Sequence, residues 1–242
     1  MYYFISDVHL GLLAREEDKK REDLLLKTLD KMMLDAKEIF LVGDIFDYWF
    51  EYSEVIPAPF YRTLTKIGEI IAKDIKITYI MGNHDFGHKS FFKSEFGINI
   101  EREDITRTIE NKKFYIAHGD GKSKNDFGYL ILKKILRSKI SNSLFRIIHP
   151  DLGIKLAKSS SSTSRDHTDK KDYGSEDGMR DFAFQTIDKG HDYVIMGHRH
   201  KFDKTPHNNG FYINLGEWLK TPTFGYFDGN DFKITKVSDF LK

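Results

Sequence analysis

Five short motifs rich in histidine, aspartate and asparagine constrain what this chain can fold into, because each of them follows a short apolar run. The runs are rich in β-branched and aromatic residues, as strands are. The motifs are Asp7-Val8-His9, Gly43-Asp44-Ile45-Phe46-Asp47, Gly82-Asn83-His84-Asp85, His118-Gly119-Asp120 and Gly197-His198-Arg199-His200. In open α/β sheets the loops at the carboxyl ends of strands converge on one crevice. We therefore expect these motifs, although far apart in the sequence, to meet in one polar site.

Predicted strands and helices alternate in the first third of the chain. Apolar residues recur at three- and four-residue spacing between about residues 21 and 36, which predicts an amphipathic helix, and a second helix is predicted between about residues 60 and 73. The predicted strands are residues 2–6, 39–42, 75–81, 114–117, 193–196, 211–214, 223–227 and 232–235. A β-α-β alternation followed by a strand-rich end favours a layered α/β or α+β sandwich.

The composition narrows the class of protein. With 242 residues and no visible internal repeat, the chain is expected to form a single domain spanning residues 1–242. It has no cysteine, so any metal must be held by His, Asp, Asn or Glu. A net charge of +1 excludes a globally basic nucleic-acid binder, and no nucleic-acid partner is expected. Lacking a signal-peptide pattern and any apolar stretch of about 20 residues, the protein is expected to be cytoplasmic, with at most peripheral membrane contact.

One segment, residues 122–171, breaks the alternation and is called the basic segment below. It contains 12 Lys or Arg against 4 Asp or Glu, a local net charge of +8. Two helices are predicted in it, at residues 127–139 and 143–158, the second interrupted near Pro150 and Gly153. We interpret it as a helical insertion over the site rather than as a separate domain.

The apolar side chains of the basic segment have two interpretations. They pack onto the main sandwich, as those of most amphipathic helices do, or they form an apolar lid whose basic residues face anionic lipid. The basic residues in question are Lys133, Lys134, Arg137, Lys139 and Arg146.

The residue types in the motifs suit a pair of divalent metal ions. Carboxylate suits Mn, Mg or Fe, and imidazole suits Zn, Fe and Mn. Two metals about 3.5–4 Å apart need a shared ligand, and Asp44, central among the motifs, is the natural bridge. Such a pair lowers the pKa of a water and neutralises phosphoryl oxygens during in-line attack. His84, next to Asn83, is placed to protonate the leaving oxygen, and Asp85 could orient its ring.

A single motif of this kind is usually a turn or a capped helix start, but the full set in this order is much more specific. Asp-x-His, Gly-Asp-x-x-Asp, Gly-Asn-His-Asp, His-Gly-Asp and Gly-His-x-His resemble the calcineurin-like metallophosphoesterases. The resemblance covers the chain outside the basic segment and implies a four-layer αββα sandwich with two central sheets. The ligands it implies are, for one metal, Asp7, His9, Asp44 and His200, and for the other, Asp44, Asn83, His118 and His198.

Within that superfamily the chain is most similar to the UDP-2,3-diacylglucosamine hydrolases of lipid A synthesis. The similarity lies in residues 43–49 and 82–86, in His118-Gly119-Asp120 with the residues after it, in the basic helical segment, and in Leu215-Gly216-Glu217-Trp218. It implies cleavage of a pyrophosphate to UMP and lipid X (2,3-diacylglucosamine 1-phosphate), typically with manganese, by a cytoplasmic protein docked on the inner membrane. The basic segment would then cap the acyl chains, which favours the lid. The implied substrate contacts are Asn83, Asp126, Tyr129 and Lys170.

Two other functions stay open. The best-known members of that branch carry Arg where this chain has His84, and Arg offers phosphate a bidentate fork that His lacks. The chain could therefore be another phosphodiesterase, acting on nucleotides, cyclic nucleotides or nucleic-acid ends. Stacking aromatics would serve a nuclease, although an aromatic cluster is more often packing; the candidates are Tyr48, Trp49, Phe50 and Tyr52. A non-catalytic interaction module would lack ligands, and none is missing from the motifs.

The remaining histidines match no ligand position of the family. We interpret each as a surface or structural residue. They are His88, His149, His167, His191 and His207.

Overall fold

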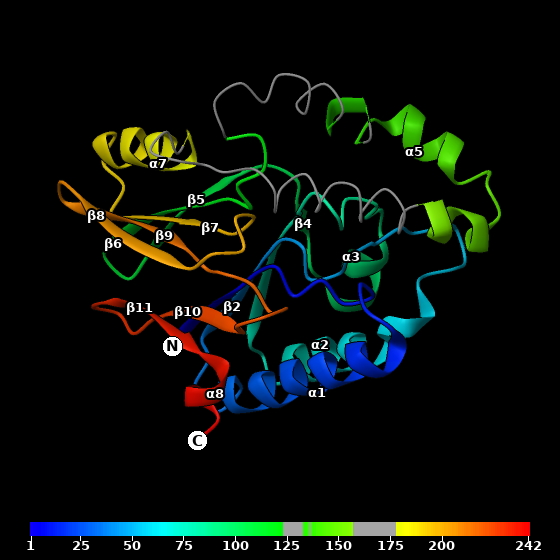
Figure 1. The fold of residues 1–242 in the computed structure, drawn as a ribbon, viewed down its shortest axis with the longest axis horizontal. Coiled ribbons are helices and arrows are strands. Elements are labelled where there is room, and N and C mark those ends of the chain that lie inside the picture. The colour runs from blue at the N-terminus through cyan, green and yellow to red at the C-terminus, as the bar shows by residue number, and fades with distance from the viewer. Residues whose placement is uncertain (123–132, 136, 157–177) are drawn as a thin grey trace.

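Two β-sheets stacked face to face lie at the centre of the described part of the molecule, with helices on both outer faces (Figure 1). The computed structural model describes residues 1–122, 133–135, 137–156 and 178–242. Among these residues, no helix is both long enough and apolar enough to cross a membrane.

The first sheet has the strand order β11-β10-β1-β2-β3-β4. Its strands are β1 (Tyr2–Ile5), β2 (Glu38–Val42), β3 (Lys76–Ile80), β4 (Ile100–Glu101), β10 (Thr223–Phe227) and β11 (Phe232–Lys236). Strands β1 to β4 are parallel, whereas β10 and β11 add an antiparallel edge. Strand β2 is buried along its whole length, as a central strand covered on both faces must be.

The second sheet has the order β5-β6-β7-β9-β8. Its strands are β5 (Ile105–Ile109), β6 (Lys112–Ile116), β7 (Tyr193–Met196), β8 (Asp203–His207) and β9 (Gly210–Asn214). Strands β6, β7 and β9 are parallel. The edge strands β5 and β8 pair antiparallel with β6 and β9, respectively. The parallel strands of each sheet therefore end on a common edge, where their loops can meet.

Helices cover the outer face of each sheet. Together with helices in connecting segments, such as α5 in the basic segment, they are α1 (Arg15–Met32), η1 (Ala58–Phe60), α2 (Tyr61–Ala72), α3 (Phe91–Phe96), α5 (Lys139–Phe145), α7 (Gly178–Asp188) and α8 (Val237–Phe240). In Figure 1, α1 and α2 lie beneath the first sheet and α7 lies above the second. The predicted α/β sandwich of helices, sheet, sheet and helix is confirmed.

Three apolar layers hold this arrangement together. Leu25 and Ile67 belong to the layer that joins α1 and α2 to the first sheet. Phe4 and Phe114 belong to the layer between the sheets, with ring centroids 6.0 Å apart. Met179 of α7 packs on the second sheet in the third layer. Burial of this kind stabilises by about 25 cal/mol per Å² of apolar surface, so the stacking follows from the apolar faces of the strands.

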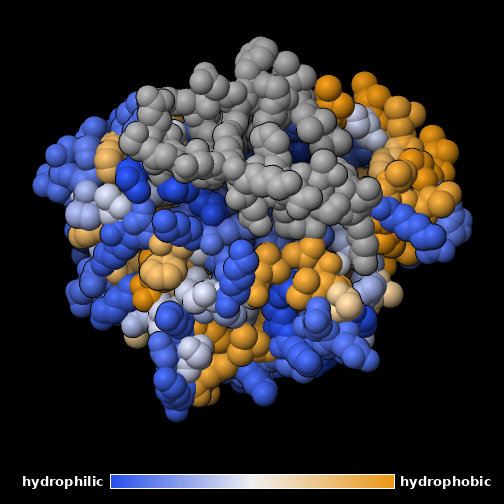
Figure 2. All heavy atoms as spheres, in the orientation of Figure 1, coloured by the Kyte–Doolittle hydropathy of each residue, from blue (hydrophilic) through white to orange (hydrophobic). Residues whose placement is uncertain are grey.

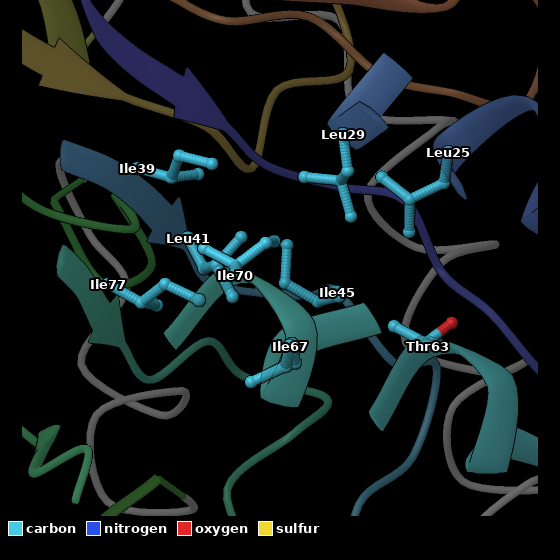
Figure 3. Close-up of a pocket in the computed structure, with 9 residues that line it drawn as sticks. All are labelled: Leu25, Leu29, Ile39, Leu41, Ile45, Thr63, Ile67, Ile70 and Ile77. Carbon is cyan, nitrogen blue, oxygen red and sulfur yellow. The ribbon is translucent and has the colours of Figure 1, made fainter. Parts of the chain in front are cut away.

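The cavity drawn in Figure 3 lies inside the layer under the first sheet and has a volume of about 10 Å³. It is lined by apolar side chains and by Thr63. That volume is about the minimum for one water molecule. The cavity is therefore a packing defect of the core and no binding site.

Every strand predicted from the sequence is present, with each end within two residues. The first predicted helix was wrong at both ends, because α1 begins at Arg15 and ends at Met32. Its first turn contains Glu16, Glu17 and Asp18. Negative charge there is stabilised by the helix dipole, which favours the earlier start.

The helix predicted at residues 143–158 begins earlier, at Lys139, and the interruption predicted near Pro150 is present. Helix α5 ends at Phe145, and a second helical stretch covers residues 150–156. Ser138 caps α5 by accepting a hydrogen bond from the backbone of Ser141 (3.1 Å), and Pro150 is well suited to a first helical turn. The helix predicted at residues 127–139 lies largely outside the described residues.

Candidate metal centre

All of the sequence motifs come together at the carboxyl ends of the parallel strands. The motif residues follow their strands in this way: Asp7 and His9 after β1, Asp44 after β2, Asn83 and His84 after β3, His118 after β6, and His198 and His200 after β7. Both sheets thus contribute ligand atoms to one site, as expected for loops at the ends of parallel strands.

The backbone of these motifs is bent in an uncommon way. Within the motifs, five residues have φ between 51° and 69°: Asp7, His9, Asp44, His198 and His200. This left-handed region is costly for residues other than glycine and is concentrated at functional sites. Gly82 is required for a different reason: a side chain there would collide with the carboxylate of Asp44. The loops therefore adopt strained backbone conformations that direct their side chains towards a common point.

One cluster consists of Asp7, His9 and His200, whose ligand atoms lie within 4.8 Å of one another. The Nε2 atoms of His9 and His200 are 3.1 Å apart, and His200 Nε2 is 3.4 Å from Asp7 Oδ1. Asp7 and His9 are fully buried. A carboxylate and two imidazoles facing each other in this way form a donor set that suits Mn, Fe or Zn.

A second cluster consists of Asp44, Asn83, His118 and His198. His118 Nε2 is 3.1 Å from Asp44 Oδ2 and 2.9 Å from Asn83 Oδ1, and His198 Nδ1 is 3.0 Å from the same Asn83 oxygen. Asp44 Oδ2 also lies 3.9 Å from His9 Nε2 in the first cluster. Asp44 is thus within reach of both clusters, where the predicted bridging ligand has to be.

The remote nitrogens of two of these histidines have partners of their own. His9 Nδ1 lies 3.2 Å from the carboxylate of Asp47, and His118 Nδ1 lies 3.0 Å from the carbonyl of Val42. Histidines that bind metals almost always engage their second nitrogen in this manner, which fixes the ring with the other nitrogen facing the metal. The residues present therefore fit a pair of divalent ions. No role was predicted for Asp47 from the motif, although the need of a metal-binding histidine for a second partner could have indicated one.

The electrostatics of the centre favour a cation. Burial raises the pKa of Asp44, but the positive charges of His118 and His84 outweigh it and hold that pKa well below its usual range. Burial lowers the pKa of His118, but Asp44 outweighs this effect and raises it to about 10. Burial and the charge of His118 lower the pKa of His198 to about 4. Ionised buried carboxylates of this kind attract positive charge, and metal binding releases the protons that otherwise supply it.

His84 lies beside the first cluster. Its backbone N–H donates to Asp44 Oδ1 (2.8 Å), its ring packs edge-on against that of His9 with centroids 5.0 Å apart, and its Nδ1 is 3.9 Å from Asp47. His84, His9 and Asp44 also form a group whose ligand atoms lie within 4.8 Å. The ring is thus near enough to the centre to meet a substrate held there.

Asp85 fixes the loop that carries Asn83 and His84. Its carboxylate accepts hydrogen bonds from the backbone of Gly82 (2.7 Å) and Ile45 (3.0 Å) and from the hydroxyl of Tyr79 (2.6 Å). These bonds tie the loop after β3 to the loop after β2. The suggested orientation of the His84 ring by Asp85 stays a prediction.

The predicted substrate contacts Asp126, Tyr129 and Lys170 lie outside the described residues. Of the four aromatic side chains considered for base stacking, Tyr48, Trp49 and Phe50 are buried and Tyr52 is partly exposed. Trp49 packs against Phe46 and Phe60 of the core, and these aromatic side chains therefore serve packing.

Several basic residues of the basic segment face the protein rather than lipid, so that expectation was wrong for them. Lys133 Nζ is 2.7 Å from the carboxylate of Asp120, Arg137 donates to the carbonyl of Gly82 (2.8 Å), and Arg146 donates to that of Glu51 (2.9 Å). Lys134 is exposed. Through Lys133 and Arg137 the segment is tied to the loops after β6 and β3 by charge-assisted contacts.

Apolar side chains of the same segment point outward. They are Ile135, Ile140, Leu144, Ile147, Leu152 and Leu156, each more than half exposed. Figure 2 shows apolar surface gathered over the part of the molecule where α5 lies. A clustered set of exposed apolar side chains marks an interaction surface, whereas single ones need no explanation.

Comparisons with known proteins agree with this picture. A sequence model of the calcineurin-like phosphoesterase family matches residues 2–202. A UDP-2,3-diacylglucosamine hydrolase from Porphyromonas gingivalis is 28% identical, covering 98% of this chain and 97% of its own, and one from Proteus mirabilis is 24% identical over 96% and 94%. The solved structure of an archaeal phosphodiesterase superposes with a TM-score of 0.50 at 16% identity, covering 97% of this chain and 98% of that one, which indicates a shared fold.

Proposed function

The chain belongs to the calcineurin-like phosphoesterase family and is a metal-dependent phosphoester hydrolase, and from that premise we propose that it hydrolyses the pyrophosphate bond of UDP-2,3-diacylglucosamine. The products are UMP and 2,3-diacylglucosamine 1-phosphate. The observation that carries this proposal is the set of outward apolar side chains on a segment bound to the ligand loops. Relatives named UDP-2,3-diacylglucosamine hydrolase, which match along nearly the whole chain, support it.

We propose that the metal ligands are Asp7, His9, Asp44, Asn83, His118, His198 and His200. Divalent ions held there, which we take to be Mn²⁺, would supply charge to the phosphoryl oxygens and lower the pKa of a nearby water. The protein's part is to hold these side chains in fixed positions, which the buried loops and the partners Asp47 and Val42 achieve.

His84 acts on the leaving group. Its ring lies at the edge of the centre, only 9% of the residue is exposed, and its backbone is fixed by Asp44. From this position the imidazolium donates a proton or a hydrogen bond to the bridging oxygen of the pyrophosphate, which leaves with the phosphate that is not attacked. Asp85 holds the loop in the conformation that this requires.

The exposed apolar side chains of the basic segment receive the acyl chains. Each Å² of apolar surface that they bury contributes about 25 cal/mol, so one acyl chain can supply much of the binding free energy. A lipid substrate also places the enzyme at the membrane that contains it, and we propose peripheral contact with the cytoplasmic face of the inner membrane.

The experiment compares substrates on manganese-loaded protein. We expect kcat/KM to be much higher for UDP-2,3-diacylglucosamine than for the same nucleotide sugar without acyl chains and for a simple phosphodiester, with UMP and the lipid phosphate as products. Equal kcat/KM on all three would overturn the proposal and favour a general phosphodiesterase.

A further inference from the structure

The second metal cluster is assembled from both sheets. Asn83 follows β3 of the first sheet and His118 follows β6 of the second, yet Asn83 Oδ1 and His118 Nε2 are 2.9 Å apart. The distance between these ligand atoms therefore depends on how two separate loops are held relative to each other. Contacts that span the loops control the site.

Arg137 of the basic segment makes such a contact. Its Nη2 donates to the carbonyl of Gly82 (2.8 Å), the residue before Asn83, and lies 3.5 Å from the carboxylate of Asp120, two residues after His118. The Asp120 side chain is 4% exposed and that of Arg137 15% exposed. A single guanidinium thus joins the loops that carry two ligands of one cluster.

Lys133 reinforces the contact on one side only. Its Nζ is 2.7 Å from the same carboxylate oxygen of Asp120, and among the described residues this ammonium makes no contact with the loop after β3. Among the described residues, the polar contacts of the Arg137 guanidinium are to Gly82, Asp120 and the carbonyl of Arg102 (3.5 Å). None of these contacts involves Asp7, His9 or His200, the ligands that belong to the first metal ion alone.

We propose that Arg137 is a positioning residue for one of the two metal ions, the ion held by Asp44, Asn83, His118 and His198. Through this side chain the basic segment sets the affinity of that ion and leaves the other unaffected. The proposal rests on the proposed ligand set. The planar guanidinium has donors enough to serve both partners at once, whereas the ammonium of lysine is a point charge without that fixed fork. Movement of the segment when a lipid binds is then felt at one metal ion.

The test is a titration of metal-free protein with Mn²⁺. Calorimetry measures the binding of each ion, and the electron paramagnetic resonance signal measures the Mn²⁺ that stays free. Arg137→Ala should lower the affinity for one of the two ions by about 10–100-fold, the usual effect of removing an outer-shell partner. Asn83→Ala identifies the affected ion, since combining it with Arg137→Ala should cause no further loss. Arg137→Lys should give a smaller loss at the same ion.

Arg146→Ala is the matched control. Arg146 also anchors the basic segment, but it donates to the carbonyl of Glu51 and lies over the ring of Phe50 (5.2 Å), away from the proposed ligands. We expect both ions to bind this variant as they bind the wild type.

The proposal is overturned if Arg146→Ala weakens the same ion equally, if Arg137→Ala weakens both ions alike, or if it changes neither. Should Arg137→Ala fail to fold by circular dichroism, Arg137→Lys decides, and unchanged affinities would then overturn the proposal. No substrate enters the titration, so a failure of the lipid hydrolase proposal is seen only in the substrate comparison.

Discussion

The ligand loops and the basic segment are built in opposite ways. Asp7, His9 and Asp44 are at most 1% exposed, whereas Ile140 and Ile147 are 74% and 80% exposed. The loops are fixed by strained backbone and by hydrogen bonds to both sheets, and the segment is attached through a limited set of side chains such as Arg137 and Arg146. In the proposed function, the chemistry that needs fixed geometry is assigned to the buried part, and recognition of a large apolar ligand to the exposed part.

The largest effect is expected from the buried part. Asp44→Ala removes the side chain that reaches both clusters, so it should abolish activity and release at least one metal ion. The loss of rate should exceed the roughly 10–100-fold that an outer-shell change costs. Metal analysis of the purified variant is the check, and full occupancy by two ions would remove Asp44 as the bridge.

His84→Ala tests whether the loops contain more than metal ligands. We expect turnover to fall by about 10²–10⁴-fold, the scale of a lost acid–base partner, with both metal ions retained. Steady-state kinetics at saturating metal measures this. Unchanged kinetics would exclude His84 from the reaction, and loss of a metal ion would make it a ligand.

The exposed part should respond only to lipid. Replacing Leu144 and Ile147 together by serine should lower kcat/KM for the lipid substrate by about tenfold or more, since each buried apolar side chain contributes about 1.5–3 kcal/mol. The free energy of unfolding should change by less than about 0.5 kcal/mol per site, because both are exposed.

The matched control for this change is Leu34→Ser. Leu34 is 81% exposed but lies in the turn after α1, outside the basic segment. It should leave kcat/KM unchanged on every substrate. An equal loss on a simple phosphodiester in the Leu144 and Ile147 variant would mean that the segment is structural, and the contrast between the two regions would disappear.

Glu51 lies at the border between the two regions and should contribute to stability in a pH-dependent manner. Its carboxylate accepts hydrogen bonds from Trp49, Ser90 and Phe91. Burial raises its pKa, but the contact with His88 and the bond from Phe91 outweigh this and lower it to about 2, from 4.5. A lowered pKa stabilises the fold above pH 4.5, and this contribution is lost as the pH falls towards 2.

Glu51→Gln should therefore lower the free energy of unfolding by about 1–3 kcal/mol at pH 7, with the difference from wild type fading below pH 4.5. Urea unfolding at several pH values measures it. Arg146→Ala, which removes a bond to the Glu51 carbonyl only, should keep the wild-type pH dependence. A constant difference for Glu51→Gln at all pH values would show that its charge is unimportant.

The buried strand β2 could be predicted from the sequence, whereas the exposed edge strand β8 could not. Strand β2 reads as a continuous apolar run and was found. Strand β8 (Asp203–His207) lies at a sheet edge, is half exposed and contains Pro206, so it has no such signal. Helix α7 was missed although Met179, Ala183 and Ile187 recur at four-residue spacing, a pattern that predicts an amphipathic helix.

The site shows the same division. The proposed ligands lie in short motifs whose spacing is visible in the sequence. The contacts that hold them are not visible there, because Arg137 reaches Gly82 across 55 residues and His9 reaches Asp47 across 38. Such contacts depend on the tertiary structure, which local patterns cannot encode.

The left-handed backbone of five motif residues has a consequence for how this protein tolerates mutation. Positive φ costs an ordinary residue about 1 kcal/mol or more, but costs glycine almost nothing. In thermal unfolding, metal-free His9→Gly should therefore be more stable than metal-free His9→Ala by about 1 kcal/mol. Equal stabilities of the two variants would contradict this expectation. At these positions the sequence best suited to folding differs from the one suited to catalysis, so selection for stability alone would erase the active centre.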